Sequence, residues 1–206
     1  MRFILLSALL LLAACSTPDT QQASRTAASP ADSATVAEPM DTARAAKVNA
    51  QSDTLKTVRR KHLFSSPSTP DVFTLTLRGP NLLSGEASFT ITDASGQVIF
   101  REVLTAPDLE AALVYELQGT SASQAEREAF VKKRMDEFFA DKNFQQPALR
   151  KSDAYQPGSV DRATWDDLQR RPDTVSFRYL VGKEETRRIV WSPLKKQVVK
   201  LGSTGG

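Results

Sequence analysis

The 206-residue sequence has only one cysteine, Cys15, and only one histidine, His62. A single cysteine cannot form a disulfide within the chain, so the fold must be held by its core. Ser/His/Asp and Cys/His catalytic sets and zinc sites all draw on these two residue types. The sequence also has no Gly-rich phosphate loop and no G-x-S-x-G turn. We therefore expect a protein that is not an enzyme, with no catalytic residues, cofactor or metal.

An excess of charge of one sign is also missing, because 27 Lys and Arg stand against 24 Asp and Glu and leave a net charge of +3. This is too small for a dedicated nucleic-acid-binding protein of this length. The charge is uneven, since residues 150–206 carry 12 basic and 7 acidic side chains and residues 1–149 carry 15 and 17. The basic C-terminal part fits an acidic partner or an anionic lipid surface. The alternative is a solvated sheet face with ordinary charge scatter.

The only long apolar run lies at the N-terminus, where residues 3–12 follow the positive charge of Arg2. A run of about ten apolar residues has the length of the hydrophobic core of a signal peptide. A bilayer-spanning helix needs about 20 such residues. The run ends in small residues and then in the sole cysteine, which predicts an export signal that is cut near this point.

The tetrad Leu12-Ala13-Ala14-Cys15 resembles the lipobox of bacterial lipoproteins. In that family the cysteine thiol receives a diacylglycerol, the signal peptide is cut before the cysteine, and the new amino group is usually acylated. The resemblance implies a signal peptide over residues 1–14, cleavage between Ala14 and Cys15, and a lipid on Cys15. Two or three acyl chains are enough for stable membrane anchoring. The alternative is an ordinary secretory signal followed by a chance cysteine.

The residues after the cysteine bear on where such a lipoprotein resides. Under the enterobacterial sorting rule, an aspartate directly after the cysteine retains the protein in the inner membrane, and this sequence has Ser16 there. Some lineages use an acidic run at this point to reach the cell surface, whereas here only Asp19 is acidic. We therefore expect an outer-membrane lipoprotein that faces the periplasm.

Residues 16–58 contain no aromatic side chain and are rich in Ala, Ser, Thr, Asp, Gln and Pro. Such a composition cannot bury enough apolar surface to offset the entropy of ordering, so residues 15–58 are interpreted as the lipidated cysteine and a disordered tether. A coil of this length reaches about 35–40 Å. Residues 59–62 are expected to form a solvated junction, with contact to anionic headgroups as the alternative. A single domain is expected over residues 59–206.

Alternating apolar and polar residues predict strands at 72–78, 87–92 and 97–104, which form a three-stranded antiparallel meander. The sequence Asp93-Ala94-Ser95-Gly96 is typical of a hairpin turn, with Gly96 suited to a left-handed conformation. The first strand buries Phe73, Leu75 and Leu77 and leaves threonines on its other face.

A helix over residues 123–140 is predicted by a capping box from Ser123 to Glu126 and by an apolar stripe. The stripe comprises Val131, Met135, Phe138 and Phe139. The remaining expected elements are short helices at 107–113 and 161–169 and strands at 174–181, 187–192 and 196–201. Two runs of strands separated by helix indicate an α+β fold, with the 123–140 helix packed across an antiparallel sheet.

The segments FTLTLRG…SFTITDASGQVIF, KKRMDEFFADKNF and IVWSPLKKQVVKL resemble small uncharacterised lipoproteins of Bacteroidota-type bacteria. The resemblance covers most of residues 72–201. It implies a similar small envelope domain and brings no assigned activity with it.

Trp191 ends a predicted strand that also carries Arg187 and Arg188, and we expect these three to form an exposed aromatic and basic patch. Such a patch could receive an acidic glycan or an envelope protein, while burial of the aromatic ring in the core is the alternative. The sequence thus predicts a membrane-anchored, non-catalytic binding module. Two further alternatives are a periplasmic hydrolase or hydrolase inhibitor acting on envelope polymers, and a carrier of a lipid or small apolar ligand.

Overall fold

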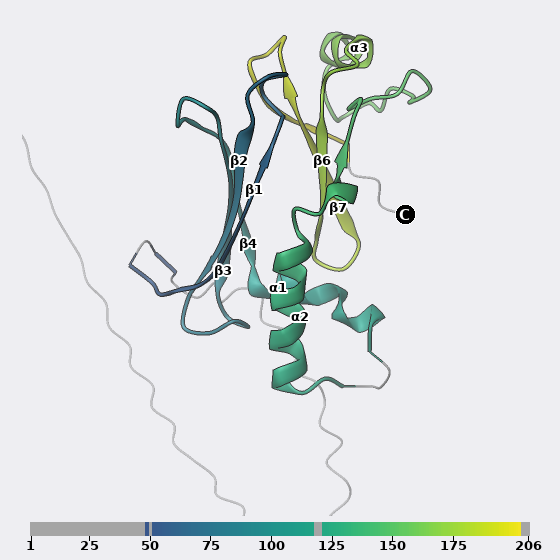
Figure 1. The fold of residues 1–206 in the computed structure, drawn as a ribbon. Helices are drawn as coiled ribbons and strands as arrows, with labels where there is room; N and C mark the ends of the chain where they lie inside the picture. Colours follow the sequence, from purple (N-terminus) through teal and green to yellow (C-terminus); the bar gives the residue numbers. More distant parts are fainter. Residues whose placement is uncertain (1–47, 50, 118–120, 203–206) are drawn as a thin grey trace, which may run out of the picture. The chain divides into compact units, whose positions relative to one another are not determined.

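Eight strands form two antiparallel sheets of four strands each in the computed structural model, which describes residues 48–49, 51–117 and 121–202 (Figure 1). All described residues belong to one compact unit. Sheet A contains β1 (Thr54–His62), β2 (Asp71–Arg78), β3 (Glu86–Thr92) and β4 (Val98–Thr105) in that order. Sheet B contains β5 (Phe144–Gln145), β6 (Ser176–Val181), β7 (Glu185–Ser192) and β8 (Gln197–Leu201) in that order.

The helical elements lie between the two sheets in the chain, apart from one that interrupts sheet B. They are α1 (Ala106–Glu110), the 3₁₀ helices η1 (Ala111–Tyr115) and η2 (Asp141–Asn143), α2 (Gln124–Glu137), and α3 (Arg162–Arg170), which connects β5 to β6. The predicted α+β class is confirmed. The expected three plus three strands are four plus four, because β1 and β5 were not predicted, and they form two sheets instead of one.

The meander of sheet A follows the predicted alternation. In β2, Phe73, Leu75 and Leu77 are fully buried, and in β3 the same holds for Ala87, Phe89 and Ile91. The predicted turn between β3 and β4 is present, with Gly96 at φ 89°. The carboxylate of Asp93 accepts hydrogen bonds from the backbone N–H groups of Ser95 and Gln97, both at 2.9 Å, so one acidic side chain holds this hairpin together.

Strand β1 corrects two expectations, because residues 54–58 were assigned to the tether and residues 59–62 to a solvated junction. Both segments pair with β2 along the edge of sheet A. Lys56 forms an ion pair with Asp136 on α2 at 2.8 Å, and the ring of His62 stacks on Phe144 with centroids 3.9 Å apart. The folded domain therefore begins by Thr54, five residues earlier than expected.

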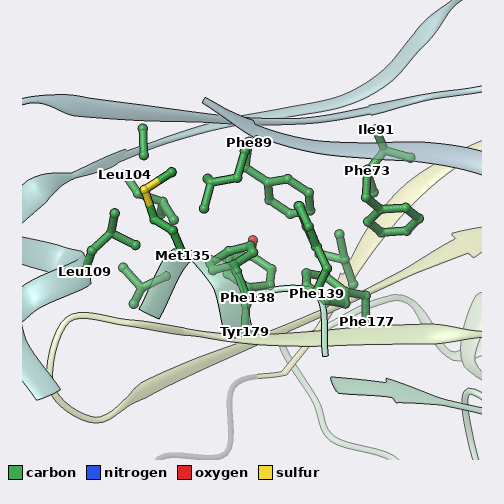
Figure 2. Close-up of a cluster of buried hydrophobic side chains, with 14 of the residues drawn as sticks. Phe73, Phe89, Ile91, Leu104, Leu109, Met135, Phe138, Phe139, Phe177 and Tyr179 are labelled. Carbon is green, nitrogen blue, oxygen red and sulfur yellow. The ribbon is translucent and has the colours of Figure 1, made fainter. Parts of the chain in front are cut away.

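Helix α2 carries the side chains that join the two sheets. Its N-terminus has the predicted capping box, in which Ser123 accepts from the Glu126 N–H and the Glu126 side chain accepts from Ser123. Met135 near its end and Phe138 and Phe139 just after it are buried between the sheets (Figure 2). The helix ends at Glu137, three residues before the predicted boundary. The main core thus forms where the end of α2 meets the facing sides of both sheets.

Sheet B has packing partners on both faces. Its second face packs against α3 in a smaller cluster in which Trp165 and Leu168 contact the strand residues Val190, Val199 and Leu201. The α3 N-cap is Asp161, whose side chain accepts from the Thr164 N–H at 2.9 Å. Sheet A differs, because none of the described elements packs on its outer face, where Val98 and Val103 are 45% and 55% exposed.

Candidate binding surface

The three residues of the predicted patch do not share one surface. Successive residues of a strand point to opposite faces, so Arg187 and Trp191 face sheet A and the adjacent Arg188 faces the α3 side. Trp191 is half-buried and packs against the main core. The expected exposed combination of one aromatic ring and two arginines is therefore split between the two faces of β7.

Arg187 belongs to an ion-pair network that joins the sheets. The carboxylate of Glu102 on β4, only 11% exposed, accepts hydrogen bonds from the Arg187 guanidinium and the Tyr179 hydroxyl and lies 3.3 Å from the Lys200 ammonium. Burial, together with the hydrogen bond to Glu102, raises the pKa of Tyr179. The hydrogen bond to Glu185 raises the pKa of Arg187, which stays charged. These groups satisfy one another, so we assign the network to stability and not to ligand binding.

The outer face of sheet A presents mainly polar side chains. Antiparallel pairing aligns its side chains in rows across all four strands, and one row runs Arg59, Thr74, Thr90 and Arg101. The adjacent row runs Thr57, Thr76, Ser88 and Val103. We call this surface the hydroxyl face, and its hydroxyl-bearing residues are Thr57, Thr74, Thr76, Ser88, Thr90 and Thr92.

Basic side chains border the hydroxyl face on its two edge strands. Arg59 and Lys61 lie on β1 and Arg101 lies on β4, and all three are exposed. No carboxylate oxygen of a described residue lies within 4 Å of their charged nitrogen atoms. Neighbouring strands are about 4.8 Å apart, so the backbones of Arg59 and Arg101 are separated by about 14 Å. The face therefore presents rows of hydroxyl groups between two positively charged edges.

Part of the hydroxyl face is hollowed. A shallow pocket of about 410 Å³ lies over β2, β3 and β4 and is lined by Thr76, Ser88, Thr90 and Arg101, among others. Arg78 and Glu86, which pair in the register of β2 and β3, line its end. The hollow therefore combines hydroxyl groups, which both donate and accept hydrogen bonds, with guanidinium groups, which only donate, and with the Glu86 carboxylate, which only accepts.

The sequence contained part of the signal for this surface. The repeats Thr74-Leu75-Thr76 and Thr90-Ile91-Thr92 place threonines on one side of each strand. Only the register shows that these threonines form continuous rows, and only β1 supplies the second cationic edge. Because β1 was not predicted, the surface could not be assembled from the sequence.

Two of the predicted functional residues, Ala14 and Cys15, lie outside the described residues. Among the residues that the structure does describe, no three His, Cys, Asp or Glu side chains come together in a group that could hold a metal ion. No helix in this part of the chain is long and apolar enough to cross a membrane. The sequence matches no protein-family model, and neither a curated protein nor a solved structure matches it.

Proposed function

We propose that the chain is a lipid-anchored outer-membrane protein that faces the periplasm, and that its domain binds an acidic glycan of the envelope without catalysis. The observation that carries the binding proposal is the hydroxyl face with its three exposed cations, Arg59, Lys61 and Arg101. An exposed basic surface attracts an acidic polymer over about a Debye length, which is about 8 Å at physiological salt.

The chemistry of the hydroxyl face favours a glycan over a protein as the acidic partner. A stable protein interface has an apolar or aromatic centre within a polar rim. Here threonines and Ser88 occupy most of the outward positions of the two central strands, where Val72 is the apolar exception, and Val98 and Val103 lie on the edge strand β4. Threonine hydroxyls can exchange hydrogen bonds with sugar hydroxyls, while the arginine forks bind carboxylate or phosphate groups in a bidentate manner.

The lipid anchor rests on the lipobox resemblance at Leu12–Cys15. The tether in this proposal ends at Asp53, because Thr54 already belongs to β1. Replacing Cys15 with serine is expected to leave an uncut and unlipidated precursor. Labelled palmitate that still enters the Cys15→Ser protein would contradict the anchor.

The carrier alternative has less support than glycan binding. An enclosed apolar ligand would need free space between the two sheets, and aromatic rings occupy that space. The ring of Phe138 lies 5.5 Å from Phe89 and 5.6 Å from Tyr179, measured between centroids. Phe177 and Phe139 are 5.7 Å apart on the same scale.

A photocrosslinking experiment in intact envelopes tests the proposal. A photoreactive residue is placed at Thr90, in the middle of the hydroxyl face, and in a control protein at Leu194, which is 54% exposed in the turn between β7 and β8. After irradiation, we expect the Thr90 position to yield products that carry acidic carbohydrate and the Leu194 position to yield none.

The outcomes separate the alternatives. If the crosslinked partner at Thr90 is digested by protease and contains no carbohydrate, the surface binds a protein and not a glycan. Equal carbohydrate yields at Thr90 and Leu194 would show non-specific contact and would overturn the proposed surface. Changing both Arg59 and Arg101 to alanine in the Thr90 protein should remove the carbohydrate product.

A further inference from the structure

A second cationic site lies on sheet B, on the face that α3 covers. Arg188 on β7 is half-buried there, and no carboxylate of a described residue forms an ion pair with it. Its Nε donates to the Ser176 hydroxyl at 3.0 Å, and its Nη2 donates to the Ala148 carbonyl. The remaining nitrogen, Nη1, has no hydrogen-bond partner among the described side chains and backbone groups. A guanidinium in this state keeps donors available for a ligand.

Two more arginines add positive charge around Arg188. Arg178 on β6 is its direct partner in the register, and Arg150 lies in the loop that leads to α3. Neither forms an ion pair within the described part of the chain. Burial lowers the pKa of Arg188, the attraction of Asp153 opposes this effect, and the smaller repulsions from Arg178 and Arg150 add to it. The site therefore holds more positive than negative charge in a partly desolvated position.

A pocket of about 320 Å³ opens beside Arg188. Its lining includes Arg150, Asp153, Gln145 and Gln156 and the ring of Trp165. This volume is at the lower end of the range for ligand pockets, about 300–1,000 Å³. The pocket thus has room for a small molecule and not for a polymer.

The loop that carries Arg150 is fixed by hydrogen bonds. The side-chain amide of Gln169 on α3 donates to the carbonyl groups of Arg150 and Asp153, both at 3.0 Å, and to that of Lys151 at 3.3 Å. The carboxylate of Asp153 accepts from the Arg150 N–H at 2.9 Å. A loop held in this way reduces the entropy that ligand binding would cost.

We propose that this pocket binds a small anion, with Arg188 at its base and Arg150 at its rim as the two groups that hold a carboxylate or phosphate. A planar guanidinium matches two oxygens of either group and forms charge-assisted hydrogen bonds with them. The site lies on sheet B and is separate from the hydroxyl face of sheet A. It therefore gives the domain a second, small-molecule ligand that does not depend on the proposed glycan.

Isothermal titration calorimetry at constant ionic strength tests the site with two probes, inorganic phosphate and succinate. We expect saturable binding of at least one probe to the wild-type protein, and the preferred probe identifies the anionic group. Arg150→Ala should weaken that binding at least tenfold, because the exposed Arg150 side chain makes no hydrogen bond to the described residues and so keeps its donors for the anion. Arg170→Ala is the matched control, since Arg170 is an exposed arginine of α3 outside the pocket lining.

Arg188→Lys keeps the charge and removes the fork, and it should also weaken binding at least tenfold. Since Arg188 contributes to the fold through Ser176 and Ala148, the melting temperature of this variant is measured in parallel, and Arg150→Ala decides the result if Arg188→Lys unfolds. The proposal is overturned if neither probe binds saturably, or if Arg150→Ala binds as tightly as Arg170→Ala. The Arg59→Ala/Arg101→Ala protein should bind the probe normally, which separates this test from that of the hydroxyl face.

Discussion

Replacing Phe138 with alanine should destabilise the domain more than any surface change. The Phe138 side chain is 1% exposed and its ring lies within 6 Å of Phe89, Phe139, Phe177 and Tyr179, measured between centroids. It therefore contacts sheet A, sheet B and its own helix end at once. A buried Phe→Ala change costs about 3–5 kcal/mol, the upper part applying where the cavity cannot collapse. Two sheets that are each tied by hydrogen bonds cannot close such a gap easily, so we expect about 4–5 kcal/mol.

Urea unfolding followed by circular dichroism measures this loss. For a domain of this size, 1 kcal/mol shifts the melting temperature by about 2–4 °C, so the melting temperature should fall by about 8–20 °C. The matched control is Val103→Ala, because Val103 is 55% exposed on the outer face of sheet A and should change stability by less than about 0.5 kcal/mol. A loss below about 1 kcal/mol for Phe138→Ala would refute the reasoning that α2 joins the sheets.

Three further changes test other parts of the fold. Glu102→Gln removes the negative charge of the carboxylate that Arg187 and Tyr179 both contact. The free energy of unfolding, measured in urea, should fall by about 1–3 kcal/mol. An unchanged urea midpoint would show that the network does not join the sheets. A soluble chain that starts at residue 48 should have the same melting temperature as one that starts at residue 16. A chain that starts at residue 59 lacks five residues of β1, and its melting temperature should be lower by several degrees. Equal melting temperatures for all three chains would show that residues 54–58 do not stabilise the domain. The hydrogen bond from Lys195 lowers the pKa of Asp161, so this carboxylate stabilises the fold above about pH 4 and loses the effect as the pH falls. The difference in melting temperature between the wild type and Asp161→Asn should therefore become smaller from pH 7 to pH 3. A difference that does not change with pH would contradict the ion pair.

The elements with clear periodicity were predicted from the sequence. In β2 and β3 every second residue is apolar and buried, and in α2 the apolar stripe follows a capping box. Each of these signals is local, because it arises from which side of one strand or helix meets the core. The hairpin at Asp93 is local in the same sense, since its hydrogen bonds span only a few residues.

Strand β1 could not be recognised in this way because Val58 is the only apolar residue among its inward positions Lys56, Val58, Arg60 and His62. Lys56, Arg60 and His62 alternate with outward residues, and each finds a partner far along the chain, namely Asp136, Asp141 and Phe144. Charged residues are typical of edge strands, where they oppose aggregation. The pattern of β1 therefore makes sense only when α2, η2 and β5 are in place.

The division into two sheets was also beyond local reasoning. Strand β5 has only two residues, and α3 lies between it and β6, so the sequence gives no sign of where sheet B begins. The split of the predicted patch is a different case. Arg187 and Arg188 are adjacent in a predicted strand, and the period of two already places them on opposite faces. That expectation could have been corrected from the sequence alone.

The most direct test of the binding proposal is a titration of the purified domain into fluorescently labelled polygalacturonate, followed by fluorescence anisotropy. We expect saturable binding that weakens at least tenfold, or about 1.4 kcal/mol, when Arg59 and Arg101 are both changed to alanine. The control protein carries Arg162→Ala and Arg170→Ala, which remove the same charge from exposed positions of α3, and it should bind like the wild type. Equal affinity of the two double variants would contradict a glycan site on the hydroxyl face.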